Sequence, residues 1–249
     1  MQKLPIYCEL HGADENILLY QQREDPNFLT MDSKEFYQKS LNTQPSNWHY
    51  RNNPVRYNWN ANGYRAPEWN TVDWANSIVV MGCSLVAGEG LDEDDTITVQ
   101  MSKMLDEPVV NLGVPAGSAD VLFYNTIRMV DLGIRPKSVI VLSPMWSRTV
   151  SFGVPSTNLG PWCSSVPSFD RGLVTYYEQY VRRMPNAEVH GYLSLRGVKE
   201  AWENADVPVH VLDQAELSQF VDYSRDLAHP GINTAYNWAT ELCARLKTS

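Results

Sequence analysis

Cysteine is scarce in this sequence, and its copies are far apart. The four cysteines, Cys8, Cys83, Cys163 and Cys243, form no C-x-x-C pair. Such spacing offers neither a disulfide framework nor the clustered ligands of a structural zinc site. We therefore expect reduced thiols, as in cytosolic proteins, and no metal site.

Long apolar runs and a surplus of positive charge are also missing. No run approaches the roughly 20 residues of a membrane-spanning helix, and the opening M-Q-K-L-P-I-Y-C-E-L-H lacks the apolar segment of a signal peptide. The formal net charge is −9, which disfavours nucleic acid or an anionic membrane as a partner. We therefore expect a cytoplasmic protein that binds neither membranes nor nucleic acids.

Apolar and aromatic residues, by contrast, are plentiful. The 249 residues are 43% hydrophobic and include eight tryptophans and thirteen tyrosines, enough for one large α/β domain with a substantial core. Aromatic residues are densest between 48 and 74, which indicates packed surface rather than a flexible linker. We expect residues 1–74 to form an aromatic-rich N-terminal extension that packs on a main domain of residues 75–249, with short helices at 16–20 and 33–41. Alternatively, some of these rings line a sugar-binding or partner surface.

Short apolar runs alternate with segments of helical periodicity. The expected buried strands are residues 78–81, 109–112, 139–142 and 207–212. The expected helices are residues 97–105, 118–133, 173–184, 194–204, 215–221 and 232–246. This alternation predicts a parallel sheet covered by helices on both faces. Residues 151–170 form a long connection rich in serine and proline, and connections of that length are usually functional or mobile.

The first apolar run leads directly into a serine. In the stretch S-I-V-V-M-G-C-S the run ends at Gly82, and Ser84 follows two residues later. Because glycine lets the chain turn sharply, we expect the Ser84 side chain at the carboxyl edge of the sheet, where open α/β sheets place their ligand sites. The pattern alone is a weak signal, since many strands end in glycine and serine.

A serine hydroxyl becomes a nucleophile only when a base removes its proton. Among the five histidines, His229 differs from the others because it lies in a loop between two helical segments, with Asp226 three residues before it. One turn can therefore present both a base and the carboxylate that orients it. The same residues also suit a structural turn, in which Asp226 is a cap and His229 precedes a helix-opening Pro230.

Together these segments resemble the SGNH (GDSL-type) hydrolases. Gly82-Cys83-Ser84 is similar to the Gly-Asp-Ser block of that family, and Asp226-Leu-Ala-His229 is similar to its Asp-x-x-His block. The segments V-V-N-L-G-V-P-A-G-S and N-A-N-G-Y-R-A-P-E are also similar to stretches of that family. The resemblance implies a flavodoxin-like three-layer αβα sandwich with a parallel sheet. It also implies ester hydrolysis by a Ser84, His229 and Asp226 triad, with no metal or organic cofactor.

Two positions depart from the family pattern. Cys83 replaces the family's aspartate, and we expect its side chain to point into the structure while Ser84 points out. The family's third-block asparagine, which helps to bind the oxyanion, falls on Trp146, and the aspartate after it falls on Ser147. We expect the Trp146 ring N–H or the Ser147 hydroxyl to take over this role, since an oxyanion hole needs preorganised donors.

The other donors implied by the resemblance are backbone N–H groups. One belongs to Ser84 itself. The second-block glycine falls at Ala116 or Gly117, and we favour Gly117 because an N–H aimed at an oxyanion often needs glycine's backbone freedom.

The sequence thus predicts a serine esterase or acylhydrolase. Trp146, Arg148 and Trp162 lie at the base of the 151–170 connection and within it, and flat rings beside a polar wall suit a sugar. We expect a short acyl ester, most simply acetyl, on a small molecule or a carbohydrate. The alternative is a catalytically weak or inactive relative that binds a carbohydrate or protein partner, which the missing asparagine favours. A nucleotide-binding protein is disfavoured, because no G-x-G-x-x-G or Walker-type loop follows any strand.

Overall fold

A four-stranded parallel sheet forms the centre of the protein. The computed structural model describes residues 25–29, 31–151, 157–166, 169–183 and 186–247 of the chain. The strands are β1 (Ile78–Gly82), β2 (Val109–Gly113), β3 (Ser138–Ser143) and β6 (Val209–Asp213), in the order β2-β1-β3-β6. All three strand pairs are parallel. The predicted parallel sheet is confirmed.

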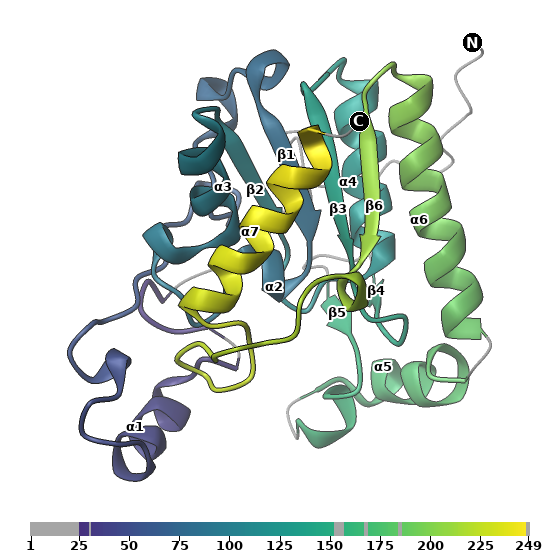
Figure 1. The fold of residues 1–249 in the computed structure, drawn as a ribbon. Helices are drawn as coiled ribbons and strands as arrows, with labels where there is room; N and C mark the ends of the chain where they lie inside the picture. Colours follow the sequence, from purple (N-terminus) through teal and green to yellow (C-terminus); the bar gives the residue numbers. More distant parts are fainter. Residues whose placement is uncertain (1–24, 30, 152–156, 167–168, 184–185, 248–249) are drawn as a thin grey trace.

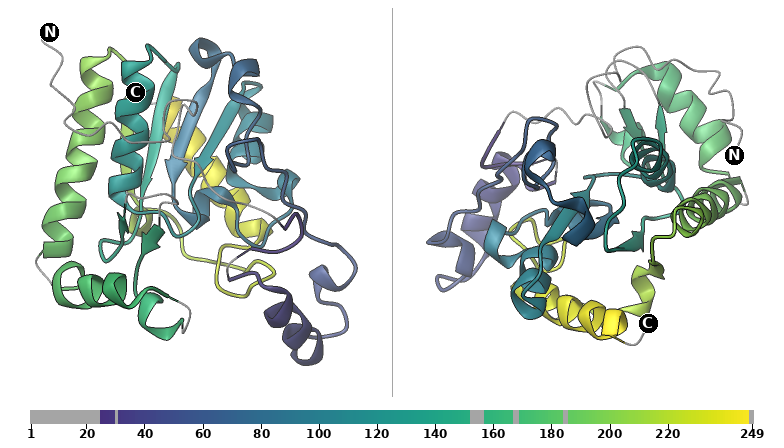
Figure 2. Two further views of the ribbon diagram at one scale, coloured as in Figure 1. Left: turned by 180° about the vertical axis from the view of Figure 1, so that it is seen from behind. Right: turned by 90° about the horizontal axis from the view of Figure 1, so that it is seen from above.

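Long helices cover both faces of this sheet. Helices α3 (Ile97–Leu105) and α7 (Ile232–Lys247) lie on one face, and α4 (Ala119–Asp131) and α6 (Asn186–Asn204) lie on the other, as Figure 1 and Figure 2 show from opposite sides. The predicted three-layer αβα sandwich is therefore confirmed.

The central strands are apolar throughout because both of their faces are buried. Successive side chains of a strand point to opposite faces. Accordingly, Val79 and Met81 of β1 belong to the core under α4 and α6, whereas Val80 belongs to the core under α3 and α7. Strands buried on both faces read as continuous apolar runs rather than as alternating ones, and this is why they stand out in the sequence.

The strand order also sets where a ligand site is expected. Because β1 lies between β2 and β3, the connections on its two sides lead in opposite directions. In open α/β sheets this change of direction opens a crevice at the carboxyl ends of the two strands. Gly82 ends β1 and Ser143 ends β3, so the residues that follow them border this crevice.

Several smaller elements surround the sandwich. Helices α1 (Lys34–Thr43), α2 (Ser84–Ala87) and α5 (Arg171–Tyr176) are short, and α5 continues into a π-helical turn at Tyr177–Val181. Strands β4 (Thr149–Ser151) and β5 (Thr157–Leu159) form an antiparallel pair. Single 3-10 turns occur at His49–Arg51, Trp69–Thr71, Trp74–Asn76, Glu93–Asp95, Cys163–Ser165 and Gln214–Glu216.

Three predicted elements differ from the structure. The 151–170 connection contains regular structure, because β4 ends at Ser151 and β5 (Thr157–Leu159) pairs with it. Helix α6 begins at Asn186, earlier than predicted. The helix predicted at 215–221 is a single 3-10 turn, which Asp213 and Glu216 cap at its N-terminal end, and the chain is extended again at Leu217. The helix predicted at 16–20 lies outside the described residues.

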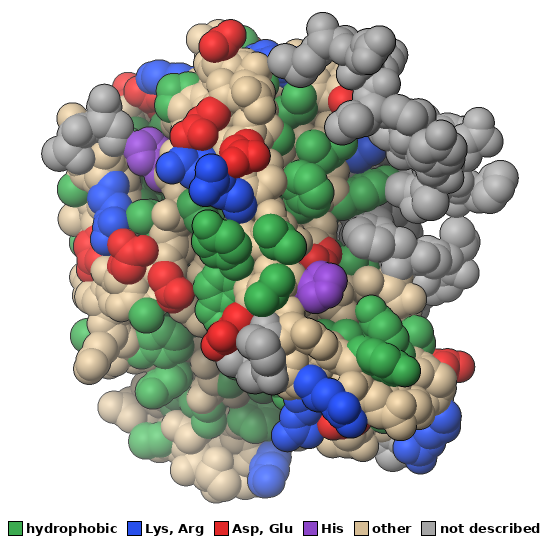
Figure 3. All heavy atoms as spheres, turned by 90° about the vertical axis from the view of Figure 1, so that its right-hand side faces the viewer, with side chains coloured by type: hydrophobic (Ala, Val, Ile, Leu, Met, Phe, Trp, Pro, Cys, Tyr) green, Lys and Arg blue, Asp and Glu red, His purple; other side chains and the backbone are tan. Residues whose placement is uncertain are grey.

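The outer face of α6 carries hydrophobic as well as charged side chains. Val189, Tyr192 and Leu193 are exposed there, and Figure 3, which faces this side of the molecule, shows hydrophobic side chains gathered between charged ones. Within the described residues, no helix has both the length and the apolar character needed to span a membrane.

Candidate active site

Ser84 is the first residue of α2, directly beyond the carboxyl end of β1. A Cβ at Gly113 would lie only 2.1 Å from the Ala87 backbone nitrogen, so glycine is needed where α2 packs against the end of β2. The buried Asn111 side chain donates to the Val86 carbonyl at 2.8 Å. These contacts fix α2, and with it the Ser84 side chain, at the edge of the sheet.

His229 and Asp226 lie in a tight loop before α7, formed by residues 222–231 and called the histidine loop here. The Ser224 N–H donates to the His229 carbonyl at 2.9 Å, and Tyr223 pairs with Pro230. Leu227 at the tip has a φ of 57°, in the left-handed region. Backbone hydrogen bonds therefore close the loop and hold the Asp226 and His229 side chains on it.

The three side chains form a continuous hydrogen-bonded chain. Ser84 Oγ lies 2.7 Å from His229 Nε2, and His229 Nδ1 lies 2.5 Å from Asp226 Oδ2. Asp226 Oδ1 accepts further hydrogen bonds from the Ser224 hydroxyl and from the N–H groups of Ala228 and His229, at 2.7, 2.9 and 3.0 Å. The fold thus brings together the three residues that the sequence singled out, although 145 positions separate Ser84 from His229.

The electrostatics of this chain favour an ionised aspartate beside a basic imidazole. Burial acts to raise the pKa of Asp226, but its hydrogen bonds and the charge of His229 outweigh burial and lower it. Burial acts to lower the pKa of His229, but the hydrogen bond and charge of Asp226, together with the charge of Glu89, raise it above its ordinary value. A carboxylate that stabilises the imidazolium is what a general base paired with a serine requires.

Glu89 is a further acid at this site that the sequence analysis did not identify. Its Oε2 lies 3.9 Å from His229 Nε2, and its Oε1 accepts from the Met31 N–H at 2.7 Å. The side chain is almost completely buried, and burial raises the pKa of its carboxyl group. Its one signal in the sequence is an acidic residue between two glycines, in G-E-G, just after the serine.

The upstream N-A-N-G-Y-R-A-P-E segment supports the loop that follows α2. Arg65 of this segment is buried and donates to the carbonyls of Gly88 and Leu91 at 2.9 and 3.0 Å. Its charge is matched by Glu93 at 3.1 Å. Arg65 therefore fixes the turn in which Glu89 lies.

The expected backbone donor Gly117 does not fit the geometry. The Gly117 N–H donates to the Val114 carbonyl at 2.7 Å, so this hydrogen bond already uses it. Ala116 instead has a φ of 60°, in the left-handed region that favours glycine. Its N–H has no hydrogen-bond partner among the described residues. Of the two positions left open by the sequence, Ala116 is the one with an available donor.

Trp146 and Ser147 are the two residues expected to replace the missing asparagine. The Trp146 ring packs against α6, where a Cβ at Gly191 would lie 2.2 Å from its Cε3. The Ser147 carbonyl accepts from the Tyr177 hydroxyl at 3.0 Å, and no hydrogen bond of the Ser147 hydroxyl is found in the described part of the chain. Trp146 is thus a packing residue of the α6 layer.

An asparagine does reach the second-block loop, but from β5. Asn158 Nδ2 donates to the Pro115 carbonyl at 3.1 Å. That carbonyl belongs to the same peptide unit as the Ala116 N–H. No sequence pattern marks Asn158, because it follows the expected third-block position by twelve residues, within a connection that shows no clear periodicity.

Arg148 and Trp162, both expected to bind substrate, contact each other. The Arg148 guanidinium carbon lies 5.4 Å from the centroid of the Trp162 ring. The ring also packs closely on Gly160, where a Cβ would lie 2.2 Å from it. Trp162 therefore anchors its own loop and supports Arg148. The described residues contain no group of three or more histidine, cysteine or acidic side chains that could hold a metal ion.

No family model matches the chain, and no curated protein matches it in sequence. Solved structures of similar fold include AlinE4, an SGNH-hydrolase family esterase, at 12% identity over 72% of this chain and 76% of that chain, with a TM-score of 0.35. They also include the aryl esterase of M. smegmatis, at 12% identity over 70% and 99% with a TM-score of 0.36. A carbohydrate acetylesterase family member from Sinorhizobium meliloti matches at 9% identity over 70% and 98%, with a TM-score of 0.35. Similar structures thus include SGNH and GDSL hydrolases. The candidate chemistry rests on the side chains described above.

Proposed function

We propose that this protein is a serine esterase in which Ser84, His229 and Asp226 act as a catalytic triad. The observation that carries the proposal is the hydrogen-bonded chain from Ser84 Oγ through the imidazole to the Asp226 carboxylate, at 2.7 and 2.5 Å. Each of the three side chains is also held by its own backbone surroundings, so the group is preorganised for reaction.

The chemistry follows from these positions. Ser84 Oγ attacks the ester carbonyl carbon while its proton passes to His229 Nε2. The imidazolium, stabilised by Asp226, then protonates the alcohol oxygen, the C–O bond breaks and the alcohol leaves. A water molecule attacks the acyl-serine ester and gives its proton to the same nitrogen. The bond between the acyl carbon and Ser84 Oγ then breaks, Oγ takes the proton back from His229 Nε2, and the acid leaves.

The negative charge that develops on the carbonyl oxygen needs nearby donors. We assign this role to the backbone N–H groups of Ser84 and Ala116, in place of Gly117. Ala116 is supported by its available N–H and by its left-handed backbone. A single lost donor of this kind typically costs about 100- to 1000-fold in rate.

For the substrate we propose a short acyl group, most simply acetyl, on a small alcohol or carbohydrate. The support is that Arg148 and the Trp162 ring, whose contact is 5.4 Å long, offer polar and aromatic surface rather than aliphatic surface. The comparison to make is kcat/KM on acetylated oligosaccharides and on nitrophenyl esters with acyl chains of two to twelve carbons. A preference for the long chains would contradict this assignment.

The second candidate is a protein that binds its ligand without turnover. One observation favours it: the position of the expected third-block asparagine is taken by Trp146, whose ring packs against α6. Turnover of a short nitrophenyl ester that disappears in Ser84→Ala separates the two functions.

The direct test is covalent labelling. A fluorophosphonate probe is expected to modify the peptide that contains Ser84, and labelling should be lost in Ser84→Ala and retained in Cys83→Ala. Labelling that survives Ser84→Ala, or that is blocked by Cys83→Ala, would contradict the assignment of the nucleophile.

A further inference from the structure

Arg148 has hydrogen-bonding capacity that the described residues leave unused. Its Nε and Nη1 atoms are shielded from solvent and have no hydrogen-bond partner there. Its Nη2 reaches only the thioether sulfur of Met145, at 3.6 Å, and a thioether is a weak acceptor. Buried polar groups in folded proteins nearly always have a hydrogen-bond partner. The unpaired N–H groups of Arg148 are therefore suited to donate to a partner that a ligand brings.

The two most buried arginines among the described residues show the contrast. Arg65 is paired with Glu93 at 3.1 Å, and Arg225 is paired with Asp32 at 2.6 Å. Arg148 forms no ion pair with any described residue. The contact of its guanidinium with the Trp162 ring, at 5.4 Å, compensates the charge only in part. A half-buried cation without a counter-charge is costly, and an anion brought by a ligand would remove that cost.

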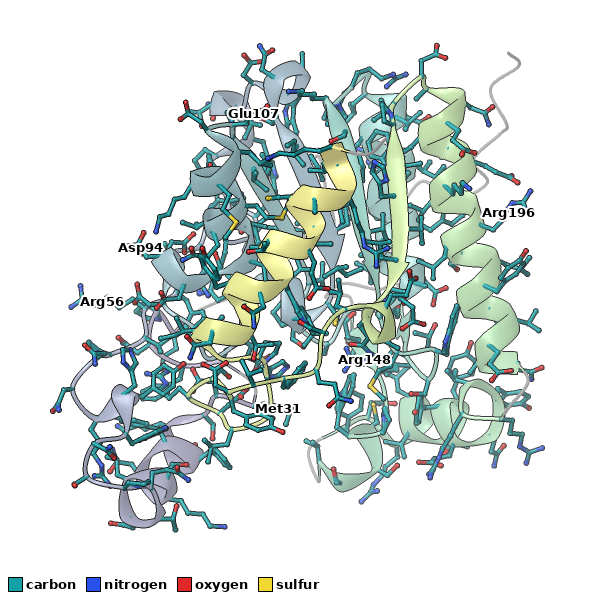
Figure 4. All side chains as sticks on the ribbon, in the orientation of Figure 1. Met31, Arg56, Asp94, Glu107, Arg148 and Arg196 are labelled. Atoms are coloured by element: carbon teal, nitrogen blue, oxygen red, sulfur yellow. The ribbon has the colours of Figure 1, made fainter. Side chains whose placement is uncertain are left out.

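The position of Arg148 connects it to the reacting groups. It lies in the segment after β3, at the same edge of the sheet as Ser84. Figure 4 places Arg148 below the carboxyl ends of β3 and β6, the edge of the sheet that Ser84 also borders. Its positive charge acts to lower the pKa of His229, so the guanidinium is close enough to be felt at the imidazole.

We propose that Arg148 binds an anionic substituent of the ester substrate, in the first instance a carboxylate, while the ester carbonyl lies at Ser84. The proposal rests on the esterase function above and adds the substrate class. A guanidinium suits this role because it stays charged, presents several N–H donors in one plane and stacks on an aromatic ring. Trp162 holds that plane in place.

The test uses pairs of esters that differ mainly in charge. On the alcohol side the pair is 4-acetoxybenzoate and 4-acetoxybenzamide, and on the acyl side it is the 4-nitrophenyl half ester of glutaric acid and 4-nitrophenyl hexanoate. We expect kcat/KM to be about 10- to 100-fold higher for the anionic member of at least one pair, mostly through KM, since charge-assisted hydrogen bonds have that strength. 4-Acetoxyphenyl phosphate then distinguishes a phosphate from a carboxylate as the preferred anion.

Arg148→Gln should lower kcat/KM for the anionic ester by about 10- to 100-fold more than for its neutral partner, so that the preference disappears, and Arg148→Lys should retain part of it. The matched control is Arg196→Gln, because Arg196 lies on α6 far from Arg148 and is paired with Glu200 at the surface. Equal kcat/KM within both pairs, or a preference that survives Arg148→Gln, would overturn the proposal. Thermal unfolding of each variant shows whether the fold is retained.

Failure of the esterase function is detected separately. Binding of 4-acetoxybenzoate and of its amide to Ser84→Ala is measured by calorimetry, with and without Arg148→Gln, so that no turnover is needed. Tighter binding of the anion that depends on Arg148 supports the anion site even if no ester is hydrolysed. Turnover that depends on Ser84 but ignores the charge of the ester overturns the anion site and leaves the esterase intact.

Discussion

Asp32 and Arg225 form a buried ion pair although they are 193 positions apart in the chain. Arg225 Nε donates to Asp32 Oδ1 at 2.8 Å, and Nη2 donates to Oδ2 at 2.6 Å. The Tyr57 hydroxyl also donates to Oδ2 and in turn accepts from the Gly90 N–H at 2.8 Å. Because Arg225 immediately precedes Asp226, this pair ties the histidine loop to the N-terminal segment of residues 25–76.

The first prediction concerns this ion pair. Asp32→Asn leaves the Arg225 guanidinium buried with too little negative charge, so the free energy of unfolding should fall by about 3 kcal/mol. Denaturant unfolding measures this. Asp94→Asn is the control, since the Asp94–Lys103 pair is exposed and its loss should cost less than about 1 kcal/mol. Equal effects of the two changes would contradict a special role for the buried pair.

The second prediction is that the triad residues act as one unit. His229→Ala should lower kcat by several powers of ten, because the Ser84 hydroxyl then has no base. Adding Ser84→Ala to His229→Ala should cost little more, since each change disables the same step. If the two losses multiply, the hydrogen-bonded chain is not the reacting group.

The third prediction concerns pH. His229 must be neutral to accept the Ser84 proton, and its pKa lies above the ordinary value of about 6.5. Activity should therefore fall as pH decreases through a value above 6.5, and kcat/KM measured against pH reports this limb.

Glu89→Gln tests one cause of that shift. The change removes the negative charge 3.9 Å from His229 Nε2 but keeps an oxygen that can accept from the Met31 N–H. The pKa of His229 should fall, so the acidic limb of activity should move to lower pH. Glu107→Gln is the control, because Glu107 lies at the opposite end of the sheet and pairs with Lys137 at the surface. An unmoved limb would mean that Glu89 is already protonated over this pH range.

The parts of the site that the sequence predicts depend on short-range patterns. Ser84 directly follows an apolar strand, and three positions separate Asp226 from His229, so each segment can be recognised in isolation. The Asp32–Arg225 pair has no such pattern, because it joins residues that only the finished fold brings together. Asn158 was missed for the same reason.

The choice between Ala116 and Gly117 shows a second limit. Both positions suit the second block in sequence, and glycine's freedom favoured Gly117. Only the backbone shows that Gly117 already donates to Val114 and that Ala116 takes the left-handed conformation. Secondary structure was predicted best where both faces of a strand are buried. It was predicted least well near residue 215, where two side chains close a single turn.

The last prediction concerns Asn158, which we regard as a positioning residue for the oxyanion donor. In a trans peptide unit the C=O and N–H bonds point in opposite directions. By donating to the Pro115 carbonyl, Asn158 therefore also fixes the direction of the Ala116 N–H. Asn158→Leu removes this hydrogen bond at similar size, and kcat should fall by about 10-fold or more while KM changes little, because the donor acts mainly in the transition state.

Three parallel variants make this test specific. Thr157→Val changes the neighbouring position of β5 and should leave kcat unchanged. Trp146→Phe and Ser147→Ala remove the ring N–H and the hydroxyl expected from the sequence to replace the third-block asparagine, and on the present geometry neither should approach the effect of Asn158→Leu. A large loss of kcat in Trp146→Phe or Ser147→Ala, with Asn158→Leu close to wild type, would return the donor role to those side chains and contradict the assignment to the Ala116 N–H.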